Sequence, residues 1–151
     1  MTEQNIIQTV VKALKKYPDI KFSKKNDSEL KIFGRENTGF DIVLLLGGRE
    51  NMLYFGPFHW HFDNSEEETN EMLDYIAFGL AGIARLKVYS IKGKGYKWTV
   101  QMQDQDGNWL DDETMALVNI KFNAEYDVKY LQNEIIPKDI LYDDSETNDL
   151  K

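Results

Sequence analysis

Apolar residues recur at helical spacing in two stretches of the chain. Between positions 2 and 17 the apolar positions are Ile6, Ile7, Val10, Val11 and Leu14. Between positions 66 and 81 they include Met72, Leu73, Ile76 and Leu80. Intervals of three and four residues place side chains on one helical face, so both stretches predict amphipathic helices. Pro18 ends the first, and Ser65 followed by three glutamates is typical of a helix start.

The rest of the chain has the pattern of short strands joined by polar turns. The predicted strands are 29–33, 40–46, 52–62, 85–91 and 96–102, with two more near 115–122 and 126–131. Because proline donates no ladder hydrogen bond, Pro57 predicts a bulge or an edge position within 52–62. The apolar run 42–46 indicates a central strand that is covered on both faces or has helices close by.

Strands grouped by short turns favour antiparallel pairing over repeated parallel crossovers. We therefore predict an α+β fold with a single, mainly antiparallel sheet of about five to seven strands and two amphipathic helices. Residues 1–136 are predicted to form one domain, because no linker interrupts the pattern. Residues 137–151 are predicted to be an acidic, frayed tail, because they contain few apolar residues.

Composition excludes several classes of site and partner. The 151 residues include no cysteine, which removes disulfides, thiol nucleophiles and thiolate metal sites. We find no apolar run long enough to cross a bilayer and no secretory leader, so we expect a cytoplasmic protein without a membrane partner. A net charge of −8 opposes bulk binding of nucleic acid.

Both histidines of the chain lie in the segment 58–63. Alternation along a strand sends His59, His61 and Asp63 to one face. Two imidazoles two residues apart can chelate zinc, but without cysteine or a third histidine the other ligands must be carboxylates such as Asp63. A metal-dependent hydrolase or metal-binding regulator that uses His59 and His61 is therefore an alternative hypothesis. The simpler interpretation is the polar face of a core strand.

No further motif indicates catalysis. The serines lack a nucleophile-elbow context, and the glycines at 47–48 and 93–95 fit turns rather than phosphate-binding loops. We predict no cofactor, and the sequence favours a non-catalytic protein over an enzyme.

Charged residues group by sign and suggest two faces that could bind a partner. The acidic face comprises Glu66, Glu67, Glu68, Glu71 and Asp74. The second face comprises Arg85, Lys87, Tyr89 and Lys97. Strand parity leaves Tyr89 as the only aromatic beside the cations of the hairpin 85–102, which favours an acidic protein partner over nucleic acid. Ordinary solvated faces would produce the same pattern.

Four strings of residues resemble small bacterial proteins for which no activity is known. They are FHWHF at 58–62, AFGL at 77–80, RLKV at 85–88 and YKWTV at 96–100. The resemblance spans about residues 53–100 and implies a bacterial origin and a shared fold, but no catalytic residue. Our leading hypothesis is a non-catalytic bacterial cytosolic protein-binding domain, such as an immunity or antitoxin-like protein. A homodimer formed through sheet edges or an exposed aromatic patch is a third hypothesis.

Overall fold

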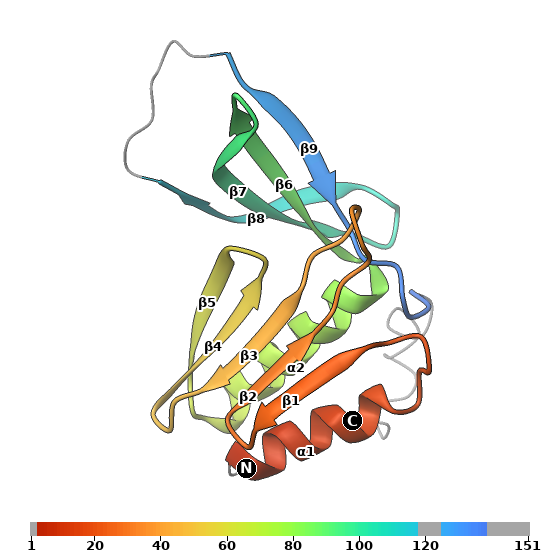
Figure 1. Ribbon diagram of the computed structural model, residues 1–151, viewed down its shortest axis with the longest axis vertical. Helices are drawn as coiled ribbons and strands as arrows, with labels where there is room; N and C mark the ends of the chain where they lie inside the picture. Colours follow the sequence, from red (N-terminus) through yellow and green to blue (C-terminus); the bar gives the residue numbers. More distant parts are fainter. Residues whose placement is uncertain (1–2, 118–124, 139–151) are drawn as a thin grey trace.

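Figure 1 traces the chain through the computed structural model, which describes residues 3–117 and 125–138. Both predicted helices are present, and strands make up most of the remainder. The elements are α1 (Glu3–Leu14), β1 (Phe22–Asn26), β2 (Glu29–Ile32), β3 (Ile42–Leu46), β4 (Glu50–Phe55), β5 (Phe58–Asp63), α2 (Glu66–Ala81), β6 (Ala84–Ile91), β7 (Lys94–Gln103), β8 (Trp109–Ala116) and β9 (Asp127–Leu131). The predicted tail 137–151 lies outside the described residues except for Pro137 and Lys138, as does part of the strand predicted near 115–122.

The strands form two antiparallel sheets. One has the order β1-β2-β3-β4-β5 and the other the order β8-β7-β6-β9. The α+β class and the antiparallel pairing are confirmed, but the prediction of a single sheet was wrong.

A hairpin adds a strand to the five-stranded sheet, and a helix then separates the two sheets. The segment predicted as one strand, 52–62, is a hairpin, because the chain turns at Gly56 (φ 55°) and Pro57. Proline suits this turn because its missing N–H would have no ladder partner there. Helix α2 then separates β5 from β6, and Gly82 ends the helix in the left-handed conformation (φ 77°) that favours glycine. After the helix, β6 belongs to the second sheet and does not pair with β5.

Helix α2 begins at a capping serine and packs closely on the five-stranded sheet through a glycine. The Ser65 Oγ accepts a hydrogen bond from the Glu68 N–H at 3.2 Å, which satisfies one of the free donors of the first turn. At Gly79 the helix lies so close to the five-stranded sheet that an added Cβ would stand 2.8 Å from the ring of Phe55. A larger residue there would push the helix off the sheet.

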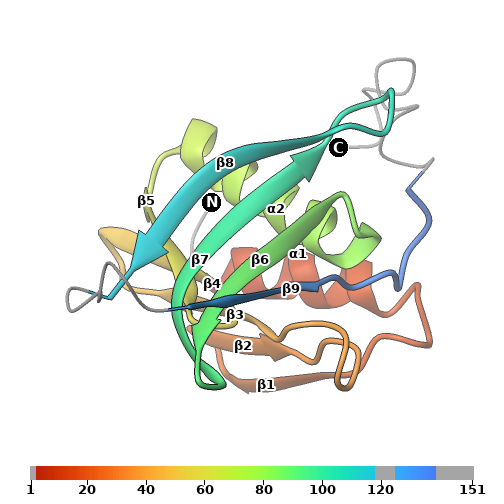
Figure 2. The ribbon, with the colours of Figure 1, turned by 90° about the horizontal axis from the view of Figure 1, so that it is seen from above.

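Both helices cover the same side of the five-stranded sheet, as Figures 1 and 2 show together. Along β3 this arrangement buries Ile42, Leu44 and Leu46, whereas Val43 and Leu45 remain partly exposed. The apolar run 42–46 is thus covered by helices on one face only. The second sheet lies over the other end of the core, where Leu86 of β6 and Val100 of β7 are fully buried.

A buried asparagine joins the end of β9 to the loop between β2 and β3. The Asn133 side chain has no solvent exposure. Its Oδ1 accepts hydrogen bonds from the N–H groups of Arg35 (3.0 Å) and Phe40 (3.2 Å). Its Nδ2 donates to the Phe40 carbonyl at 2.9 Å. Gly39 makes room for this side chain, because a Cβ at that position would lie 1.9 Å from the Asn133 Oδ1.

We predict that Asn133→Ala lowers the free energy of unfolding by about 2–4 kcal/mol, because it removes three hydrogen bonds and leaves buried backbone groups unpaired. Urea denaturation followed by circular dichroism measures the change. The control is Asn64→Ala, which removes one exposed side-chain hydrogen bond to the Gly48 carbonyl and should cost less than about 1 kcal/mol. Equal losses in the two variants would contradict the role of Asn133.

Candidate protein-binding surface

The sheet β8-β7-β6-β9 has one side that faces away from both helices, and Figure 2 looks onto this side. Alternation along β6 places Arg85, Lys87 and Tyr89 there, because Leu86 and Val88 point into the core. Lys97 joins them because it pairs with Tyr89 across β6 and β7. The structure therefore brings together the four residues of the second predicted face.

Arg85 lies between two aromatic rings from the outer strands. Its guanidinium carbon is 3.9 Å from the ring centroid of Trp109 on β8 and 4.2 Å from that of Tyr130 on β9. The Arg85 Nε donates a hydrogen bond to Gln101 Oε1 at 2.8 Å, and Gln101 Nε2 donates to Asp111 Oδ1 at 2.8 Å. Partial burial between the rings lowers the pKa of Arg85 from its ordinary value. The two ring contacts and the hydrogen bond to Gln101 hold the guanidinium in one orientation on the sheet surface.

Tyr89 forms a second cluster of cations and rings on the same side. The Lys97 Nζ lies 4.4 Å from its ring centroid, and the Lys87 Nζ lies 5.1 Å from it. The ring of Tyr126, just before β9, is 5.7 Å from that of Tyr89. Hydrogen bonding to Tyr89 raises the pKa of Lys87, so this ammonium stays charged. We name the whole set the cation–aromatic surface: Arg85, Lys87, Tyr89, Lys97, Trp109, Tyr126 and Tyr130.

Three aromatic members of this surface were missed by the sequence analysis. Trp109, Tyr126 and Tyr130 come from segments outside the hairpin 85–102, so parity within that hairpin gives no information about them. Tyr126 and Tyr130 are 56% and 48% exposed, and they lie beside Tyr89 and Arg85 respectively. A signal was present in 126–131, where Tyr126, Val128 and Tyr130 alternate with polar residues.

The predicted acidic face lies on α2 and is extended by β8. Two of its glutamates have structural roles, since Glu68 Oε1 accepts from the Asp63 N–H and Glu71 Oε1 accepts from the Tyr75 hydroxyl. Burial, Asp112 and Glu71 raise the pKa of Tyr75 to about 12. Desolvation beside α2, together with the charges of Asp112 and Glu71, raises the pKa of Glu113. Carboxylates from two distant segments therefore share one negative field.

The two histidines lie on one face of β5, with ring centroids 5.3 Å apart. The His61 Nδ1 is paired with the carboxylate of Glu50, and the His59 ring lies 5.0 Å from that of Tyr54. Among the described residues, no group of three or more histidines, aspartates or glutamates is arranged to hold a metal ion. The metal hypothesis therefore lacks a third ligand in this part of the chain.

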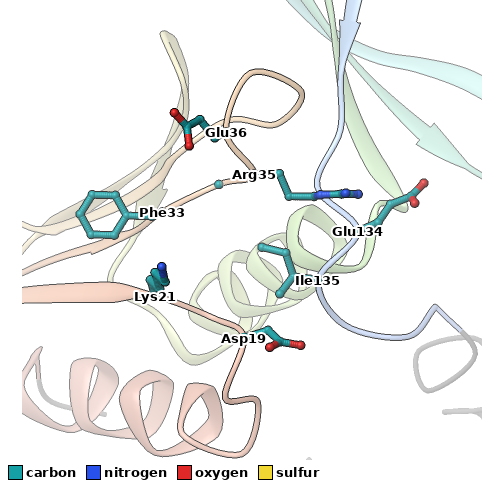
Figure 3. A pocket seen from close by; sticks show the side chains of 8 residues that line it. Asp19, Lys21, Phe33, Arg35, Glu36, Glu134 and Ile135 are labelled. Carbon is teal, nitrogen blue, oxygen red and sulfur yellow. The ribbon is translucent and has the colours of Figure 1, made fainter.

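An open pocket of about 490 Å³ lies beside the loop between β2 and β3, as Figure 3 shows. Its charged lining residues are exposed and carry both signs: Asp19, Lys21, Arg35, Glu36 and Glu134. The ion pairs found among the described residues include none of them. Sites for small molecules are mostly apolar with a few convergent polar groups. The cation–aromatic surface is therefore the stronger candidate.

Comparison with protein-family models, with curated proteins and with solved structures gives no match for this chain. Neither helix that the structure describes is long and apolar enough to cross a membrane. The candidate surface must therefore be interpreted from its own chemistry.

We predict that Glu113→Gln raises the melting temperature slightly at neutral pH. A carboxyl whose pKa is raised in the folded state favours folding only when protonated, so its charged form costs stability above that pKa. The gain should shrink as the pH falls through the titration of the carboxyl and vanish once it is protonated in both states. Differential scanning fluorimetry over a pH series measures this. The control is Glu36→Gln, which lies in an exposed loop away from the carboxylates of α2 and β8. A gain in melting temperature for Glu113→Gln that does not change with pH would contradict the prediction.

Proposed function

We propose that this chain is a non-catalytic protein-binding domain that uses the cation–aromatic surface to bind its partner. The observation that carries the proposal is Arg85 held between Trp109 and Tyr130 at 3.9 and 4.2 Å on a solvent-facing sheet. Tryptophan, tyrosine and arginine are the residues that most often dominate the binding energy of protein interfaces. Their side chains are ordered here before a partner arrives, which lowers the entropic cost of binding.

The chemistry of the surface favours an acidic protein segment over nucleic acid. Single-stranded nucleic acid needs free aromatic faces on which bases stack. Here the guanidinium of Arg85 already covers one face of Trp109 and one face of Tyr130. Carboxylates of a protein partner can instead meet Arg85, Lys87 and Lys97 one at a time.

Within this class we propose an immunity or antitoxin-like role in the bacterial cytosol. Such a protein blocks an enzyme by covering its surface and needs no catalytic group of its own. The acidic residues of α2, together with Asp112 and Glu113 on β8, supply a second surface that could face the basic site of an enzyme. We expect any self-association to use a different surface of the chain.

We predict that Arg85→Ala weakens the complex at least about tenfold, because an ordered arginine between two rings has the properties of an interface hot spot. The measurement begins with affinity capture from a lysate of the source organism and quantitative mass spectrometry. Titration of the recovered partner by isothermal calorimetry then gives its affinity for each variant. Nuclease treatment of the lysate separates a protein partner from one that is bridged by nucleic acid.

The matched control is Arg49→Ala, which removes an exposed arginine from the turn between β3 and β4. Its affinity should equal that of the unchanged chain. A second variant, Glu66→Lys combined with Glu67→Lys, tests the acidic face. Unchanged affinity in Arg85→Ala would sink the cation–aromatic surface as the binding site, and loss only in the lysine variant would move the site to α2. Capture that depends on nucleic acid would overturn the proposal of a protein partner.

A further inference from the structure

The five-stranded sheet has one side that no described helix or strand covers. Both helices lie on its other side, and we name the uncovered side the open face. Its centre is apolar and half-buried, formed by Val43, Leu45, Met52 and Tyr54. Val43 pairs with Tyr54 and Leu45 pairs with Met52, so the four side chains form one continuous apolar area of the kind that a protein partner covers.

The strand register arranges the open face in two parallel rows. The first row runs across four strands as Lys31, Val43, Tyr54 and His59. The second row runs beside it as Glu29, Leu45, Met52 and His61. Each row therefore begins with a charged residue on β2, passes through two apolar residues and ends with a histidine on β5. The two rows differ most at β2, where one carries a cation and the other an anion.

We propose that the open face is the interface of a homodimer in which two copies of this chain stack their five-stranded sheets face to face. The two-fold axis lies between the sheets, perpendicular to the strands, and passes between the two rows. This operation places each row of one copy on the other row of its partner. Lys31 then faces the second copy's Glu29, Val43 faces its Leu45, and Tyr54 faces its Met52.

Charge complementarity points to a second copy rather than to a different protein. A two-fold interface must be complementary to itself, and Lys31 with Glu29 forms a reciprocal pair of opposite charges under the operation described. Both side chains are available, being 46% and 36% exposed. Within the chain, Lys31 lies 3.6 Å from Asp41 and its Nζ is 5.1 Å from the ring centroid of Phe33, while Glu29 lies 3.9 Å from Lys25. These are exposed contacts that each contribute about 1 kcal/mol or less. This self-association goes beyond the proposed function and uses a different sheet.

The first test measures the mass of the full chain by sedimentation velocity from low to high micromolar concentrations. We expect a dimer whose dissociation constant rises at least about tenfold in Leu45→Glu, because the substitution puts a charge in the apolar centre. The matched control is Leu110→Glu on β8, where the leucine is 57% exposed and belongs to the other sheet. It should leave the dimer unchanged. Circular dichroism verifies that each variant is folded.

The second test exchanges the charges of the two rows. Lys31→Glu and Glu29→Lys should each dissociate, because in each homodimer like charges face one another twice. An equimolar mixture of the two variants should restore a dimer, since every glutamate at one position then faces a lysine of the other chain. Neither variant alters an apolar residue, so both should fold.

Three results would overturn the proposal. The first is a monomer at all concentrations. The second is a dimer that persists in Leu45→Glu and dissociates in Leu110→Glu, which would place the interface on the other sheet. The third is a mixture of charge variants that remains monomeric, which would exclude the reciprocal contact between Lys31 and Glu29. None of these results bears on the effect of Arg85→Ala, so failure of the dimer and failure of the protein-binding role are distinguishable.

Discussion

The position of the candidate binding surface depends on one buried side chain, Asn133. Its three hydrogen bonds fix the loop between β2 and β3 against the segment that leaves β9. Its neighbours extend this connection, because the Gln132 N–H donates to the Thr38 carbonyl and the Ile135 N–H donates to the Leu80 carbonyl of α2. The five-stranded sheet, α2 and β9 therefore meet at one short segment. Tyr130 lies three residues before Asn133, and its pairing with Lys87 across β6 and β9 brings its ring beside Arg85.

Local patterns predicted the helices and most strands, because each of those elements depends on its own side chains. Ser65 and the glutamates after it identify the start of α2 from the sequence alone, and the structure uses Ser65 as the cap. The division into two sheets could not be predicted in this way. It depends on whether β6 pairs with β5 after α2 or starts a new sheet, and no local pattern decides between these outcomes. The turn at Pro57 raises a separate question, because proline fits both a bent strand and a hairpin. The hairpin is decided by packing, since it places Phe58, Trp60 and Phe62 of β5 in the core.

Only the part of the cation–aromatic surface that lies in one hairpin could be predicted from the sequence. Arg85, Lys87, Tyr89 and Lys97 belong to one hairpin, where parity alone assigns their side. Trp109 and Tyr130 reach the same side only through pairing between β7 and β8 and between β6 and β9, which are contacts distant in sequence. Asn133 illustrates the same limit. Nothing in its neighbourhood in the sequence indicates that a loop about a hundred residues earlier supplies its partners.

The cations of this surface keep their positive field, although the chain carries a net charge of −8. Arg85 and Lys97 contact aromatic rings, which hold a cation without neutralising it as a carboxylate would. Asp111 is connected to Arg85 only through the uncharged side chain of Gln101. Carboxylates are concentrated instead along α2 and the facing residues of β8. The charge distribution therefore favours a dipolar domain. Separated charges of this kind steer association over distances comparable to the Debye length, so they would orient a partner of matching polarity before contact. The open face combines an apolar centre with the opposite charges of Lys31 and Glu29, and it shares no residue with the cation–aromatic surface.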